Sequence, residues 1–164
     1  MALEDLTLND LDDVQLTPES YDIAWFAADH HGHVALFYTA GQGPLPLAHF
    51  RNSAYALDPV NQWVMDLPVL GQPIPLIQTA PDAECVQHAA KGLFSYDWTD
   101  VHRSHGRVHQ YELLAVPRQP LMLSQLPEEM AQAIQTVRFM NINFANSLLL
   151  DVGSLIPCRE MQAY

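Results

Sequence analysis

Residues 21–46 read YDIAWFAADHHGHVALFYTAGQGPLP, and they predict a β-hairpin that ends in a corner rich in glycine and proline. Apolar side chains fill both faces of two extended runs, 23–28 and 34–39, as central strands of a covered sheet require. Residues 29–32 (DHHG) are typical of a turn, because glycine adopts positive φ without steric cost. The run 41–46 should then leave the sheet, since proline cannot donate to a ladder. We therefore expect the rest of the chain to pack around this hairpin.

The remaining pattern predicts a second hairpin and two well-signalled helices. Aromatic residues alternate over 93–98, and 108–116 has the composition of a return strand. Residues 79–91 begin with a capping pattern and end before Gly92, and 124–135 repeat apolar residues at about 3.6.

Five further segments carry shorter signals. Residues 47–57 have helical spacing that Asp58-Pro59 should stop, and 61–67 fit either a short helix or a strand. The proline-rich run 68–75 should be a connection. Residues 137–142 and 148–152 fit short strands. The fold class is therefore α+β, with a mainly antiparallel sheet built from hairpins and about three helices packed on it.

The composition fits one domain, preceded by an acidic arm. The chain has 164 residues, of which 49% are apolar, enough for a core without disulfide or metal staples. Residues 1–20 contain six acidic side chains and no lysine or arginine, so we predict an acidic arm there and a single α+β domain over 21–164. Charged residues make up only 16%, against a usual share of about 25%, which favours some exposed apolar area or a homo-oligomer contact.

The charge balance is the main global signal for function. Nineteen acidic residues against seven basic ones give a net charge of −12. Phosphate backbones and anionic membranes would be repelled, so we expect neither nucleic acid nor membrane as a partner. A basic protein partner would be attracted. The alternative is that the charge only keeps the protein soluble.

The cysteine content and the N-terminus favour a reducing cytoplasm. Cys85 and Cys158 lie far apart in sequence, and we expect both thiols to be free. The acidic start MALEDLTLNDLDD does not resemble a signal peptide, and no apolar run is long enough to span a bilayer.

Two histidine-rich segments are the candidate sites. His30, His31 and His33 could bind a divalent metal, although the spacing of a closed zinc site is missing and a solvated turn explains them equally. The second segment surrounds the loop between the strands of the second hairpin and offers acid–base groups, against the alternative of a surface loop. Its binding candidates are Asp97, Asp100, His102, Arg103, His105 and His109. No nucleophile motif or phosphate loop is present, so the sequence predicts no catalytic residue and no cofactor.

Several segments together resemble a family of small bacterial cytosolic proteins. They are IAWFAADHHGHVALF, GQGPLP, GLFSYDWTD and the LPEEM helix before VRFMNINF. Members of that family look like immunity-type proteins of polymorphic toxin systems. The resemblance consists of packing motifs, so it implies a fold and a type of partner and no functional residue.

Two hypotheses follow from the sequence. The first is a non-catalytic protein-binding module of bacterial type that neutralises a basic partner. The second is a small-ligand-binding or metal-binding protein, or an enzyme, that uses the loop 97–109. The second requires the two histidine-rich segments to meet in one pocket.

Overall fold

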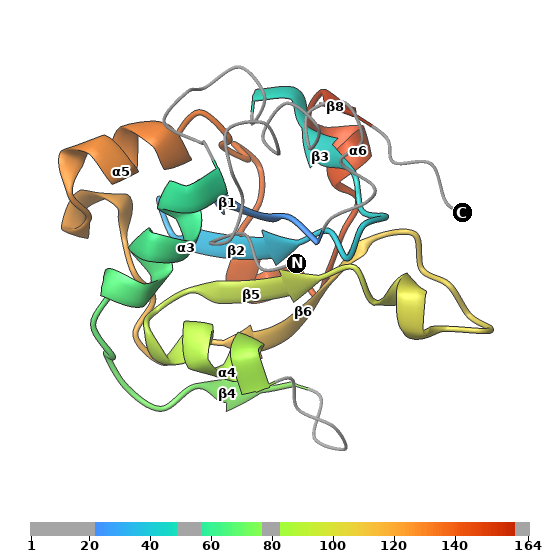
Figure 1. Ribbon diagram of the computed structural model, residues 1–164, viewed down its shortest axis with the longest axis horizontal. Helices are drawn as coiled ribbons and strands as arrows, with labels where there is room; N and C mark the ends of the chain where they lie inside the picture. The colour runs from blue at the N-terminus through green and yellow to red at the C-terminus, as the bar shows by residue number, and fades with distance from the viewer. Residues whose placement is uncertain (1–21, 49–56, 77–82, 160–164) are drawn as a thin grey trace.

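The computed structural model describes residues 22–48, 57–76 and 83–159 (Figure 1). A six-stranded sheet has the order β1-β2-β5-β6-β4, and β7 also pairs with β6. The strands are β1 (Ala24–Ala28), β2 (Val34–Tyr38), β4 (Ile74–Pro75), β5 (Phe94–Asp97), β6 (Tyr111–Val116) and β7 (Leu149–Leu150). A second, two-stranded sheet joins β3 (Leu45–Pro46) to β8 (Cys158–Arg159). The helices are α3 (Leu57–Asp66), α4 (Ala83–Ala90), α5 (Glu128–Ile134) and α6 (Val152–Leu155).

Both predicted hairpins are present. Strands β1 and β2 pair antiparallel with Trp25 opposite Phe37, and Gly32 occupies the turn at φ 84°. Strands β5 and β6 also pair antiparallel, with a bulge between Ser95 and Tyr96. The two hairpins join through a parallel pairing of β2 with β5, and α3 and α4 lie in the connection between those strands. The mainly antiparallel α+β class is confirmed, and the parallel pair is the one feature that hairpins alone do not produce.

The core is a ladder of aromatic rings that come from four strands and from the segment after α5. The rings of Trp25 and Phe37 stack at 4.1 Å, and those of Phe37 and Tyr96 stack at 4.7 Å. Tyr111 meets Trp25 edge-on at 5.6 Å, and Phe144 meets Tyr96 at 5.7 Å. All five side chains are fully buried. Offset and edge-on ring pairs add to the free energy gained by burial, so this ladder holds β1, β2, β5 and β6 in register.

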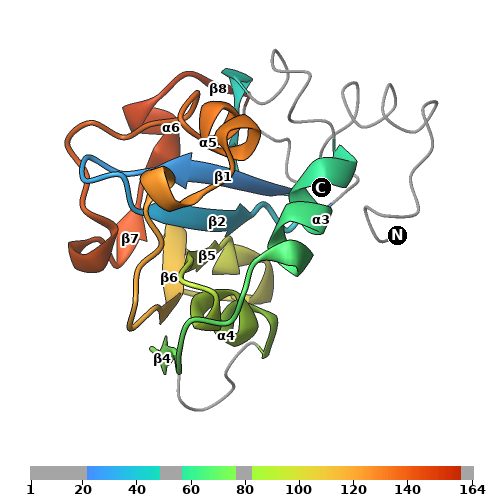
Figure 2. The same ribbon diagram turned by 90° about the vertical axis from the view of Figure 1, so that its left-hand side faces the viewer.

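Both faces of the sheet are covered, as the doubly apolar strands predict (Figure 2). On one face α3 places Trp63 near Phe26, and α4 packs Cys85 against Leu114. On the other face the chain after α5 supplies Phe144 to the aromatic ladder. Residues that alternate in direction along β1 and β2 are therefore buried on both sides.

The helix predictions hold for the described part of α4 and for α5, which is shorter than predicted. Helix α4 ends at Ala90, and Gly92 follows it with φ 94°, as a glycine after a helix C-terminus does. Lys91 donates to the carbonyl of Val64 (2.6 Å), so its ammonium caps α3. Pro127 separates α5 from a 3₁₀ turn at Leu123–Gln125, so residues 124–135 are not one helix.

Prolines account for two wrong predictions. Helix α3 begins at Leu57 and runs through Asp58-Pro59, because a proline in the first turn removes no intrahelical hydrogen bond. Strand β4 lies inside the expected connection, at a sheet edge where Pro75 needs no N–H. Pro46 leaves the main sheet as expected, but it pairs with Cys158 in the small sheet. Residues 1–21, 49–56, 77–82 and 160–164, which include the predicted arm, most of 47–57 and the start of 79–91, lie outside the described residues.

The C-terminal strands are also shorter than predicted. Residues 137–142 form only one bridge, between Ala28 and Arg138, because the chain turns away where the Phe144 amide donates to Asp29. Strand β7 ends at Leu150, since Asp151 accepts a hydrogen bond from the Ser154 hydroxyl (2.6 Å) and α6 starts there. Strand β6 starts at Tyr111, later than the predicted start at residue 108.

Two buried tyrosines, Tyr96 and Tyr111, and the partly buried Tyr38 predict an alkaline limit of stability. Burial is the main cause that raises the pKa of Tyr38, Tyr96 and Tyr111 well above the ordinary value of 10.0. A pKa that is higher in the folded state contributes stability that is complete below pH 10 and is lost as pH rises further. We expect the free energy of unfolding to fall above pH 10 by up to about 1.4 kcal/mol per pH unit for each tyrosine.

Urea unfolding between pH 8 and pH 11.5 tests this expectation, with tyrosinate absorbance followed in parallel. The three hydroxyls should ionise together with unfolding. A Tyr96→Phe variant should lose stability less steeply above pH 10. Ionisation of all tyrosines near pH 10 in a still folded protein would contradict the expectation.

Candidate functional site

The loop between β5 and β6 extends away from the body of the protein (Figure 1). It starts with a 3₁₀ turn at Thr99–His102 and returns to the sheet at Tyr111. Asp100 is buried, and its carboxylate accepts hydrogen bonds from the amides of Val108 (2.8 Å) and His109 (2.9 Å). These two bonds close the loop, and they explain why β6 starts after His109. The Asp100 carboxylate is therefore a structural acceptor.

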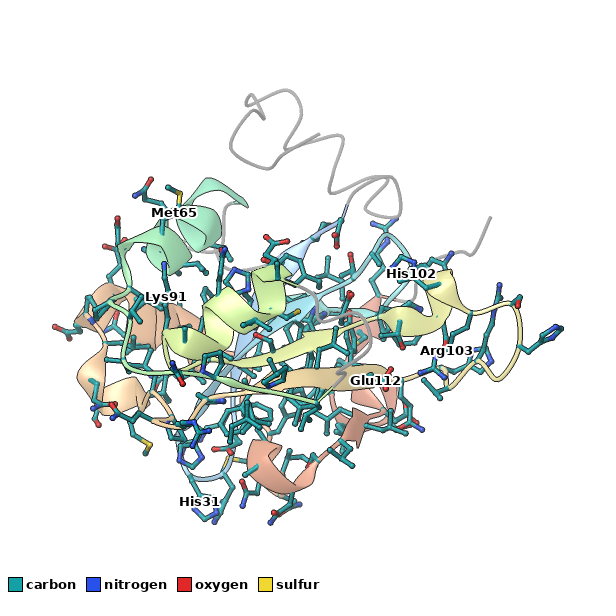
Figure 3. The ribbon with its side chains drawn as sticks, turned by 90° about the horizontal axis from the view of Figure 1, so that it is seen from below. His31, Met65, Lys91, His102, Arg103 and Glu112 are labelled. Carbon is teal, nitrogen blue, oxygen red and sulfur yellow. The ribbon has the colours of Figure 1, made fainter. Side chains whose placement is uncertain are left out.

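A second set of contacts joins the loop to strand β6. The guanidinium of Arg103 contacts the Glu112 carboxylate (2.8 Å), and the Thr99 hydroxyl donates to the same oxygen (2.7 Å). Arg103 also donates to the carbonyl of Gly106 (3.2 Å). Figure 3 shows Arg103 and Glu112 facing one another across the base of the loop. The sequence did not single out Glu112 or Thr99, although Glu112 is the only acidic residue in β6.

The structure brings only some of the predicted loop residues together. His109 Nδ1 lies 3.5 Å from the Asp100 carboxylate, but the His109 side chain is 76% exposed. His102 and His105 are exposed. Asp97 lies in β5, where it pairs with Tyr38 and with Glu112. The loop thus combines buried acceptors that are engaged by its own backbone with imidazoles that face outward.

The HHGH turn is organised by Asp29, which is fully buried. One carboxylate oxygen accepts from the amides of His31 and His33, both at 2.9 Å. The other oxygen accepts from the amide of Phe144 (3.1 Å) and lies 3.3 Å from His33 Nδ1. Asp29 therefore binds the turn to the segment that supplies Phe144 to the core. The D-x-x-G pattern predicted the turn, whereas the hydrogen bond from the Phe144 amide to Asp29 could not be predicted from residues near Asp29 in sequence.

The three imidazoles of this turn lie near one another but do not form a metal site. Ring centroids are 5.1 Å apart for His30 and His31 and 5.9 Å apart for His31 and His33. Within residues 22–48, 57–76 and 83–159, no three histidine, cysteine or acidic side chains are arranged to hold a metal ion. Neither Cys85 nor Cys158 takes part in a disulfide, and Cys85 is a buried residue of α4.

The two histidine-rich segments lie at opposite ends of the sheet. The HHGH turn precedes the start of β2, while the 99–109 loop follows the end of β5. Because β2 and β5 run parallel in register, with Ala35 opposite Phe94 and Tyr38 opposite Asp97, the strands separate the two segments. Figure 3 places His31 far from His102 and Arg103. The ligand or enzyme hypothesis required the two segments to meet in one pocket, and the structure does not bring them together.

Acidic side chains gather at the end of the sheet where the 99–109 loop begins. Burial is the largest cause that raises the pKa of Tyr38, and the carboxylates of Glu84 and Asp22 raise it further. The Tyr38 hydroxyl donates a hydrogen bond to Glu84 (3.1 Å). Asp97 and Asp22 raise the pKa of Tyr111 in the same way. We call Asp22, Glu84 and Asp97 the acidic sheet end.

Comparisons with known proteins do not assign the site. A scan against family models and searches of curated proteins and of solved structures found no match to this chain. Among the helices that the structure describes, none is long and apolar enough to cross a membrane.

Proposed function

We propose that this chain is a non-catalytic protein-binding module of the bacterial cytoplasm that neutralises a basic protein partner, as immunity-type proteins do. One observation carries the proposal. The net charge is −12, and six of the nineteen acidic residues fall in residues 1–20, where there is no lysine or arginine. Such a charge attracts a basic partner over long range and opposes binding to nucleic acid.

The geometry of the described residues supports binding in two ways. The acidic sheet end includes Asp22, two residues after the acidic stretch 1–20, so acidic residues continue along the sequence into the described residues. The buried carboxylates of the two candidate segments, Asp29 and Asp100, serve backbone amides, so neither is positioned as a general base. No observation favours the ligand or metal hypothesis for the loop 97–109.

Co-expression with the protein encoded directly upstream of this chain tests the proposal. That upstream protein alone should arrest bacterial growth. This chain should restore growth when about one copy is present for each copy of the upstream protein, because a binding module neutralises its partner by forming a complex with it. A variant in which the six acidic residues of 1–20 become amides should lose most of the protection, since long-range attraction falls with the charge. The residues are Glu4, Asp5, Asp10, Asp12, Asp13 and Glu19.

A matched variant separates binding from catalysis. Replacing the exposed His102, His105 and His109 by alanine together should leave protection unchanged. Full protection at far less than one copy per toxin copy, lost in this triple variant, would instead indicate an enzyme. Failure to protect at any level would reject the proposal.

A further inference from the structure

Two short strands lie end to end along the outer edge of β6. Strand β4 places Ile74 opposite Val116, and β7 places Leu150 opposite Tyr111. Strand β5 occupies the other edge of β6 over the same residues. Both short strands therefore pair with the same side of β6, and together they form the outermost edge of the sheet.

The two strands meet near the middle of β6. The amide of Leu76 donates to the carbonyl of Leu114 (2.9 Å), and the amide of Leu113 donates to the carbonyl of Leu148 (2.9 Å). Since Leu113 and Leu114 are neighbours, residues 74–76 and 148–150 together pair with the whole of β6. We call these six residues the composite edge.

The composite edge is apolar and exposed. Ile74 and Leu76 are each 40% exposed, Leu148 is 62% exposed and Leu149 is 42% exposed. These four are half of the large exposed apolar side chains in the described part of the chain. Exposed apolar side chains that gather along one sheet edge are a feature of interaction sites in soluble proteins.

The composite edge is also the meeting point of two stretches without charge. Residues 67–76 and 139–150 contain no Asp, Glu, Lys or Arg. A basic partner is drawn to carboxylates and gains nothing electrostatically at such an edge. Two copies that each carry a charge of −12 repel one another least where neither presents charge.

We propose that the composite edge is the surface on which a second copy of this chain docks. A two-fold arrangement sets the same edge of each copy against the other, which a self-complementary apolar surface satisfies. The contact is made by side chains, because the edge consists of two separate strands and Pro75 has no N–H, and both features prevent a continuous ladder. This proposal is independent of the basic partner, which would occupy charged surface.

Sedimentation velocity of the full chain from 1 to 200 µM tests the proposal. We expect a monomer–dimer equilibrium that strengthens as salt rises from 0.05 to 0.5 M, since salt screens the repulsion between copies. Association with a basic partner must weaken over the same salt range, so the two proposals fail separately. Leu149→Asp and Ile74→Asp should each weaken dimerisation by at least about tenfold, because each buries an unpaired carboxylate in the contact.

Met140→Asp is the matched control. Met140 is 59% exposed, and the adjacent Phe139 pairs with Ala28 at the β1 edge, on the far side of the sheet. This variant adds the same charge and should dimerise nearly as the parent does. A parent chain that is monomeric at 200 µM in 0.5 M salt overturns the proposal. Circular dichroism identifies which edge variants are folded, and an unchanged dimer in a folded edge variant overturns it as well.

Discussion

Replacing Asp29 by alanine should lower the free energy of unfolding by about 3–5 kcal/mol. The fully buried carboxylate accepts hydrogen bonds from three amides, those of His31, His33 and Phe144. Removing it leaves these donors without their acceptor inside the protein, where each unsatisfied group costs about 1–3 kcal/mol. The change also frees the segment that carries Phe144, whose ring packs on Phe37. Chemical denaturation at pH 7 measures the loss.

Asp100→Ala is the matched comparison for this prediction. Asp100 is almost as buried as Asp29, but it accepts from only two amides, and both belong to its own loop. We expect a loss of about 1–3 kcal/mol that leaves the aromatic core intact. If Asp100→Ala destabilised the protein as much as Asp29→Ala, the role of Asp29 as a link between distant segments would be wrong.

Trp25→Ala should cost about 3–5 kcal/mol, as other large-to-small replacements of buried aromatic residues do. Trp25 has no exposed surface, and it stacks on Phe37 at 4.1 Å. Its indole N–H donates to the Tyr111 hydroxyl (3.3 Å), which in turn donates to the Pro44 carbonyl (2.9 Å). The replacement therefore opens a cavity and removes a link between the hairpin and the corner at 41–46.

The measurement for Trp25→Ala is urea unfolding together with near-ultraviolet circular dichroism, which reports on the packed rings. Met140→Ala provides the control, because Met140 is 59% exposed and should change stability by less than about 0.5 kcal/mol. A Trp25→Ala protein with nearly unchanged stability would mean that the ladder from Trp25 to Tyr96 does not organise the fold.

The sequence predicted the parts of the fold that depend on local pattern. Alternation of apolar residues placed Trp25 and Phe37 in paired interior strands, and Gly32 marked the turn between them. Gly92 marked the end of α4 in the same way. These signals work because strand faces and positive φ are set by residues close in sequence.

What the sequence missed depends on contacts between distant residues. The parallel pairing of β2 with β5 follows from how α3 and α4 pack, which no short pattern records. The two-residue strands β4 and β7 form because the β6 edge is available to them. At the candidate sites the histidines drew attention, yet the organising groups are Asp29 and Asp100, whose partners lie up to 115 residues away.

The salt dependence of binding to the protein encoded upstream tests the central claim most directly. Calorimetry of the purified pair at 0.05 and 0.3 M salt should show a one-to-one complex that weakens by about tenfold or more, because the charge of −12 drives association. The variant with amides at the six acidic positions of 1–20 should bind more weakly and lose most of this salt dependence. Absence of binding at 0.05 M salt, or an affinity that does not change with salt, would contradict the account.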